Sequence, residues 1–194
     1  MSAVQHEKTG RSHIVDAARL LYATQGFHQT SMAELATAAD VSVGQIYRLF
    51  AGKNALIQAL ILEDAEAKIS ELRKLMADVT AGRLSIEAGF VELARRSLAK
   101  GDEALSFDIM AEAHRNSDVA DTIASLCAGF RSVVRDLSCV ANPKLSEGAL
   151  DGAEELVLAF LFGLGHRTLS RPRLSEAETA QVTGRMILAA LHAL

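Results

Sequence analysis

Two helix starts stand eleven residues apart in the sequence, at Ser31 and Ser42, and they constrain the fold more than any other feature. Each serine is followed three positions later by a capping partner, Glu34 and Gln45 respectively. In such a capping box the serine hydroxyl accepts a hydrogen bond from a first-turn N–H, and the Glu or Gln side chain accepts one from the serine N–H. The first helix can therefore be only about eight residues long, too short to be stable alone. Two short helices joined by a tight turn are the usual device for placing a helix in a DNA major groove.

Composition favours helices throughout the chain. Of 194 residues, 49% are hydrophobic and two are proline, which suits long helices around a sizeable core. No segment alternates apolar and polar residues as a half-buried strand does. No apolar run approaches the roughly 18 residues of a membrane-spanning helix, and the polar residues 1–10 are unlike a signal peptide. Cys127 and Cys139 are interpreted as free thiols, so we expect the chain in the reducing cytoplasm.

Helical periodicity predicts an all-α chain of about nine helices. After an unstructured N-terminus, the first helix is predicted from about Arg11 to Thr24, and a long helix begins at Lys53. The last two helices are predicted at about Ala149–Leu169 and Glu176–Leu191. Residues 1–56 carry five basic and four acidic residues, a net charge of +1, which leaves −5 for the remainder of a chain of net charge −4. This asymmetry is in the direction expected of an N-terminal DNA contact.

Four linked motifs resemble a known family. They are Gly26-Phe27, Thr30–Ala36, Val41–Phe50 and Gly52–Leu56. Together they resemble the DNA-binding domain of TetR-type transcriptional regulators, over about Arg11–Leu56. The resemblance implies an N-terminal three-helix helix-turn-helix domain (1–56) and a larger helical domain (57–194) that binds an effector and forms a homodimer. Dimers of this family form through the last two helices, packed as a four-helix bundle.

The same resemblance implies which residues contact DNA. The outer face of the second short helix supplies Val43, Gln45, Tyr47 and Arg48, with Tyr47 holding a phosphate. Gln45 can bond to adenine and Arg48 to guanine or a phosphate, while Val43 offers only a methyl contact to thymine. The alternatives are that Gln45 only caps its helix and that Arg48 is a solvated charge.

Further candidates for DNA contact stand at or near helix N-termini, where the free N–H groups and the helix dipole favour a bound phosphate. Capping alone is the alternative for the serines, and a cation at the start of a long helix, as at Lys53, is mildly unfavourable without an anionic partner. The complete predicted DNA-contacting set is Arg11, Thr30, Ser31, Ser42, Val43, Gln45, Tyr47, Arg48 and Lys53.

Aromatic and long apolar side chains in the remainder could line an effector cavity or simply form the core. The candidates are Phe90, Phe107, Met110, His114, Phe130 and Phe160. Asp108 and Glu112 could add polar contacts, although we expect Glu112 to be solvated. Gly163 and Gly165 would allow close helix packing in the last pair of helices.

The sequence contains none of the catalytic motifs that we considered. The chain has no His-Glu-x-x-His, no Gly-x-Ser-x-Gly and no phosphate-binding glycine loop, and its two cysteines do not form a metal-binding spacing. We therefore predict no enzyme, no metal and no cofactor. The hypothesis is a homodimeric repressor that binds a palindromic operator and is released by a small, partly apolar effector. The alternatives are a helical small-molecule-binding protein without DNA binding and a small helical enzyme.

Overall fold

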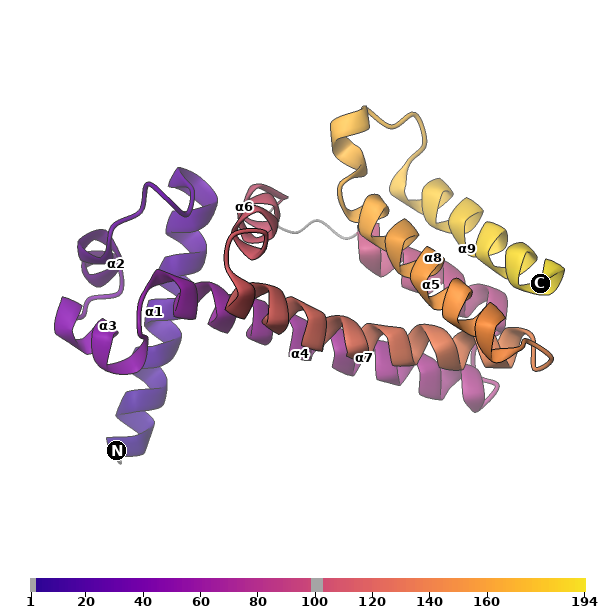
Figure 1. Ribbon diagram of the computed structural model, residues 1–194, viewed down its shortest axis with the longest axis horizontal. Coiled ribbons are helices and arrows are strands. Elements are labelled where there is room, and N and C mark those ends of the chain that lie inside the picture. Colours follow the sequence, from indigo (N-terminus) through magenta and orange to yellow (C-terminus); the bar gives the residue numbers. More distant parts are fainter. Residues whose placement is uncertain (1–2, 99–102) are drawn as a thin grey trace. The chain divides into compact units, whose positions relative to one another are not determined.

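The computed structural model describes residues 3–98 and 103–194. These residues form nine α-helices and one 3-10 helix, with no strand among them (Figure 1). The chain is thus all-α, as its composition predicts. In chain order the elements are α1 (Ala3–Gln25), α2 (Met32–Ala38), α3 (Val43–Leu49), α4 (Lys53–Thr80), α5 (Ile86–Leu98), α6 (Glu103–Ala113), α7 (Ser117–Ala141), α8 (Glu147–Gly165), η1 (Arg167–Ser170) and α9 (Glu176–Ala193).

The chain folds into two compact units. The first comprises Met1–Ala65 with Asp102–Ala124, and the second comprises Glu66–Gly101 with Ser125–Leu194. Helices α4 and α7 therefore contribute residues to both units. The first unit also contains α6, which the sequence analysis assigns to the domain 57–194. Whether function divides at residue 56 stays a prediction.

The first unit is built on α1, and the prediction for the start of this helix is wrong. The helix begins at Ala3 rather than near Arg11, so residues 3–10 are helical, while Met1 and Ser2 lie outside the described residues. Apolar periodicity detects a buried face, and a polar stretch without proline can continue a helix beyond that face. Further along, Ile14, Ala18 and Tyr22 are fully buried in the core of this unit.

The second unit has its own core, formed by α5 with α7, α8, α9 and the later turns of α4. Phe90 and Leu137 are fully buried there. Helices α5 and α9 approach closely at Gly184, where an added Cβ would lie 2.6 Å from the backbone nitrogen of Val91. Only a glycine allows the two backbones to come this near.

The last two helices differ slightly from their predicted bounds. Ser146 caps α8, so this helix begins at Glu147 and ends at Gly165, and the residues expected to extend it to Leu169 form η1 instead. Ser175 caps α9 with a third capping box, in which its hydroxyl accepts from the Glu178 N–H at 3.2 Å. In the part of the chain that the structure describes, no helix is long and apolar enough to cross a membrane.

Candidate nucleic-acid interface

The two predicted capping boxes are both formed. The hydroxyl of Ser31 accepts from the Glu34 N–H at 3.2 Å, and the Glu34 carboxylate accepts from the Ser31 N–H at 2.7 Å. Ser42 and Gln45 repeat this arrangement at 3.2 and 2.7 Å. Between the helices Asp40 adopts a left-handed conformation, with φ of 53°, which reverses the chain within a few residues. The result is a helix-turn-helix of two seven-residue helices, α2 and α3.

Helix α3 has one buried side and one exposed side. Ile46 is fully buried and Phe50 is 4% exposed, which fixes the helix against the rest of the unit. Tyr47 is 54% exposed, and Arg48 is exposed without a carboxylate partner among the described residues. The exposed side of α3 therefore carries a phenol and an unpaired guanidinium, which suit phosphate oxygens and base edges. Val43, Gly44 and Gln45 complete this side.

Gln45 caps its own helix in this structure, as the alternative interpretation has it. Its side-chain oxygen accepts from the Ser42 N–H, which leaves both hydrogens of the amide nitrogen free. An amide in this position can donate to an acceptor on a base without leaving the cap, because acceptors line the major-groove edge of every purine. A bidentate bond to adenine would also require the oxygen.

Thr30 and Ser31 differ although they are adjacent. Thr30 is 1% exposed, and its hydroxyl donates to the Gly26 carbonyl at 2.9 Å, so its side chain stabilises the turn between α1 and α2. Ser31 is exposed, and among the described residues its hydroxyl is engaged only with Glu34, whose N–H donates to it and whose carboxylate it also hydrogen-bonds. A DNA contact at either position stays a prediction, and the geometry favours Ser31.

Lys53 is held by the first unit itself. Its ammonium donates to the His28 carbonyl at 3.3 Å and lies 4.6 Å from the centre of the Phe27 ring. Desolvation lowers the pKa of Lys53, and the negative charges of Glu112 and Glu34 oppose that shift. The cation is therefore oriented before any ligand binds.

Arg11, the other predicted cation of this group, is also engaged. Its guanidinium lies 4.9 Å from the centre of the Phe50 ring and 3.7 Å from the Glu63 carboxylate. Both of these groups are on the same unit, so a phosphate would compete with Glu63 for Arg11.

Comparison with known proteins agrees with this geometry. The sequence pattern of the family described as "Bacterial regulatory proteins, tetR family" matches residues 14–60, which contain the whole helix-turn-helix. The transcriptional regulator UidR of Escherichia coli K12 is 36% identical over 110 residues. Residues 14–60 are thus similar to the DNA-binding domain of the TetR family.

The relatives of this family differ in how much of the chain they cover. The UidR match spans 57% of this chain and 55% of UidR, so the chain matches about half the length of its curated relatives. The solved structure of GusR from Salmonella enterica is 28% identical, covers 95% of this chain and 94% of its own, and has a TM-score of 0.67. FadR from Bacillus subtilis, solved in complex with stearoyl-CoA, covers 92% of this chain and 98% of its own at 16% identity and a TM-score of 0.73, which shows a shared fold.

The six predicted effector contacts are distributed over both compact units. Phe107, Met110 and His114 belong to the first unit, and Phe107 is 39% exposed. The other three belong to the second unit, where they range from fully buried to half-exposed: Phe90, Phe130 and Phe160. Their role in ligand binding stays a prediction.

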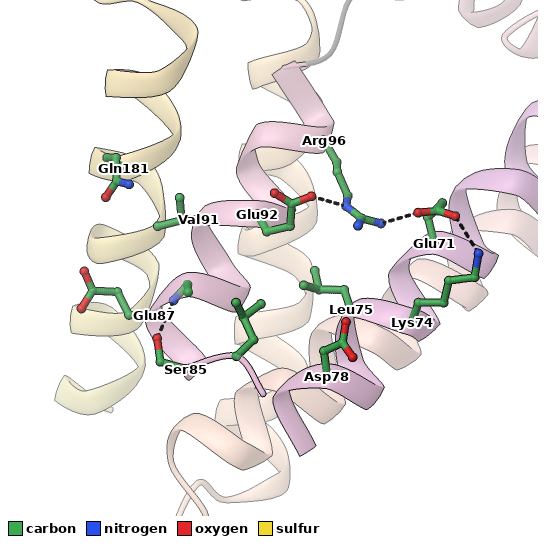
Figure 2. A pocket seen from close by; sticks show the side chains of 12 residues that line it. Glu71, Lys74, Leu75, Asp78, Ser85, Glu87, Val91, Glu92, Arg96 and Gln181 are labelled. Atoms are coloured by element: carbon green, nitrogen blue, oxygen red, sulfur yellow. Dashed lines mark hydrogen bonds and ion pairs between the residues drawn. The ribbon is translucent and has the colours of Figure 1, made fainter. Parts of the chain in front are cut away.

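A groove in the second unit lies apart from those residues. It has a volume of about 810 Å³ and is lined by α4, α5 and Gln181 of α9 (Figure 2). Across it runs a chain of ion pairs from Lys74 through Glu71 and Arg96 to Glu92. These charges neutralise one another, and none of the six predicted ligand contacts lines the groove.

One side of α6 in the first unit is buried against expectation. Glu112, expected to be solvated, is 7% exposed, because α6 packs with the turn after α1 rather than facing solvent at this position. Asp108, on the same side of α6, bonds to the backbone of that turn. No local signal could have revealed either contact, since the partners are about 80 positions away in the sequence. Among the described residues, no group of three His, Cys, Asp or Glu side chains is placed to hold a metal ion.

Proposed function

We propose that this chain is a sequence-specific DNA-binding transcriptional regulator of the TetR family. The observation that carries the proposal is the exposed side of α3, where Gln45, Tyr47 and Arg48 face solvent. The helix is capped by the box of Ser42 and Gln45 and anchored by the buried Ile46. In helix-turn-helix proteins the second helix enters the major groove and the first crosses the backbone. Here α3 would read base edges, and the N-terminus of α2 and Lys53 would contact phosphates.

We propose further that two copies bind one palindromic site. Apolar side chains are exposed on α8 and α9, among them Leu156 at 72%, Phe160 at 45% and Met186 at 55%. Exposed apolar stripes of this kind mark contact surfaces. Gly163 lies near the C-terminal end of α8, and a Cβ there would meet nothing within 4 Å, so a partner helix has room to approach. A two-fold dimer through these helices would place identical reading helices on two half-sites.

An effector that releases the protein from DNA is the remaining part of the proposal. The fold is shared with FadR, which was solved with stearoyl-CoA, so a ligand with an apolar part is a reasonable class for this chain. Its residues would come from the set Phe90, Phe107, Met110, His114, Phe130 and Phe160. Such a regulator acts in the cytoplasm, as a repressor without catalytic activity.

DNA binding can be tested by fluorescence anisotropy with labelled duplexes from the intergenic region upstream of the chain's own gene. Tyr47→Ala and Lys53→Ala should weaken binding to every sequence, and Lys53→Ala should reduce the slope of log K against log salt by about 0.9 per subunit. Gln45→Ala should instead alter the base preference, by roughly 1–3 kcal/mol at one position per half-site.

The matched control is Arg131→Ala, which removes an exposed cation from α7 in the second unit and should leave DNA affinity unchanged. If the parent binds none of these duplexes, the chain is a helical binding protein of another kind. If all three α3 and α4 variants bind like the parent, the assigned reading surface is wrong.

A further inference from the structure

The turn between α1 and α2 depends on a carboxylate from a remote part of the chain. Phe27 is 4% exposed, and its backbone N–H donates to Oδ2 of Asp108 at 2.8 Å. Asp108 lies on α6, 81 positions further along, within the same compact unit. A buried N–H needs an acceptor, because leaving it unpaired is strongly unfavourable. Asp108 is thus the acceptor that allows this turn to be closed.

Glu112 reinforces the contact from the next turn of α6. Residues four apart lie on the same side of a helix, so Glu112 faces the same segment as Asp108. Its carboxylate is 3.9 Å from Nε2 of His28, an ion pair when that ring is protonated. Its charge also raises the pKa of Lys53, against the effect of desolvation. One side of α6 therefore supports both the turn and the cation that rests on it.

The supported turn leads directly into the DNA-binding helices. Gly26 ends α1 with φ of +87°, and Thr30 bonds back to its carbonyl. Ser31, the cap of α2, follows at once, and the carbonyl of His28 holds the ammonium of Lys53. A turn that opened to hydrate the Phe27 N–H would shift both the start of α2 and Lys53 together.

We propose that Asp108 is a positioning residue for DNA recognition, so that the DNA-binding unit is completed by α6 and does not end at residue 56. The inference rests on the proposed function. Without Asp108 the turn would be closed in only a fraction of molecules, and the apparent DNA affinity would fall by that fraction. Asp108 need not touch DNA for this effect.

The charge of Asp108 and its hydrogen bond can be separated by two substitutions. Asp108→Asn and Asp108→Ala each remove one negative charge, but only asparagine keeps an oxygen that can accept from the Phe27 N–H. If only the lost negative charge affected binding, both variants would bind the DNA polyanion equally well, and slightly more tightly than the parent. The hydrogen bond predicts a difference between them.

The experiment uses the full chain and a labelled duplex that the parent binds, chosen from its upstream intergenic DNA. Asp108→Asn should bind within about twofold of the parent, and Asp108→Ala about tenfold more weakly, which is the scale of one lost hydrogen bond to a charged group. Hydrogen exchange at the Phe27 amide should be faster in Asp108→Ala alone, while sedimentation shows an unchanged oligomeric state. Glu66→Ala is the control for charge, because it removes an exposed carboxylate of α4 that forms no ion pair with the described residues. If Asp108→Ala is too unstable for the assay, Asp108→Ser, whose hydroxyl is too short to reach, takes its place.

Three results would overturn the inference. Equal affinity of the alanine (or serine) and asparagine variants, with normal binding by the parent, refutes the positioning role and leaves the proposed function intact. A parent that binds no duplex refutes the proposed function and this inference with it. Slow exchange at Phe27 in Asp108→Ala would also exclude the assigned hydrogen bond.

Discussion

Gly184→Ala tests how closely α9 must approach α5. A Cβ at this position would lie 2.6 Å from both the backbone nitrogen and Cγ2 of Val91, and 2.8 Å from its Cα. The backbone atoms of Val91 cannot rotate away as a flexible side chain could, so α9 has to move as a body. Overpacking of this kind costs about 1–3 kcal/mol, and the greater helix propensity of alanine offsets up to about 1 kcal/mol.

Because the clash is with backbone, we expect the upper end of that range and a net destabilisation of about 2 kcal/mol. For a chain of this length, each kcal/mol lowers Tm by about 2–4 °C, so Tm should fall by about 4–8 °C in a calorimetric scan. Sedimentation should also show a weaker dimer, since Met186 on the exposed side of α9 would move with the helix. The proposed DNA-contacting residues are untouched, so any loss of DNA affinity should follow the loss of the proposed dimer.

The control for Gly184→Ala is Gly10→Ala, where an added Cβ meets nothing within 4 Å. This position is inside α1, so alanine should leave Tm unchanged or raise it slightly. If Gly184→Ala melts like the parent, the helices are not held at the observed separation and the reasoning from this contact is refuted.

Two further predictions concern assembly and pH. Gly163→Leu adds a large side chain where the single chain leaves open space, so we expect normal Tm and helix content but a monomer in sedimentation equilibrium. A stable dimer would place the interface elsewhere. Hydrogen bonding to Arg95, with help from Arg96, lowers the pKa of Glu92 to about 2 from an ordinary value of 4.5. The ionised carboxylate therefore stabilises the fold above pH 4.5, and this contribution is lost as the pH falls towards about 2. Glu92→Gln should unfold at lower urea concentration than the parent at pH 7, with the difference disappearing between about pH 4.5 and 2, and a difference that is constant across this range would contradict the assignment.

Local chemistry made the helix-turn-helix predictable. A capping box involves only a serine and the residue three positions later. The helix starts at Ser31 and Ser42 can therefore be predicted without reference to the rest of the chain. Both boxes are present as predicted, and the same local pattern forms a third box at Ser175. Ile46 and Phe50, which are both buried, stand four positions apart, the spacing of neighbours on one side of a helix.

Helix ends were less accurate where no cap marks them. Polar residues precede the apolar stripe of α1, so periodicity placed its start near Arg11 although the helix begins at Ala3. In α8, the side chains at Leu156 and Val157 look equally apolar in the sequence, yet they are 72% and 7% exposed. An apolar pattern predicts that a surface will be covered, and it does not say whether this chain or another copy covers it.

The sequence by itself therefore determined which segments are helical and which short helix carries the candidate DNA contacts. Only the tertiary structure decided that α6 joins the first unit, that Glu112 is buried, and that Asp108 accepts from the Phe27 N–H. The physical reason is the separation in sequence between the residues that interact. A helix start is set by hydrogen bonds between residues three apart, whereas a buried N–H can be satisfied by an acceptor from any part of the chain, and which acceptor reaches it depends on how all the helices pack.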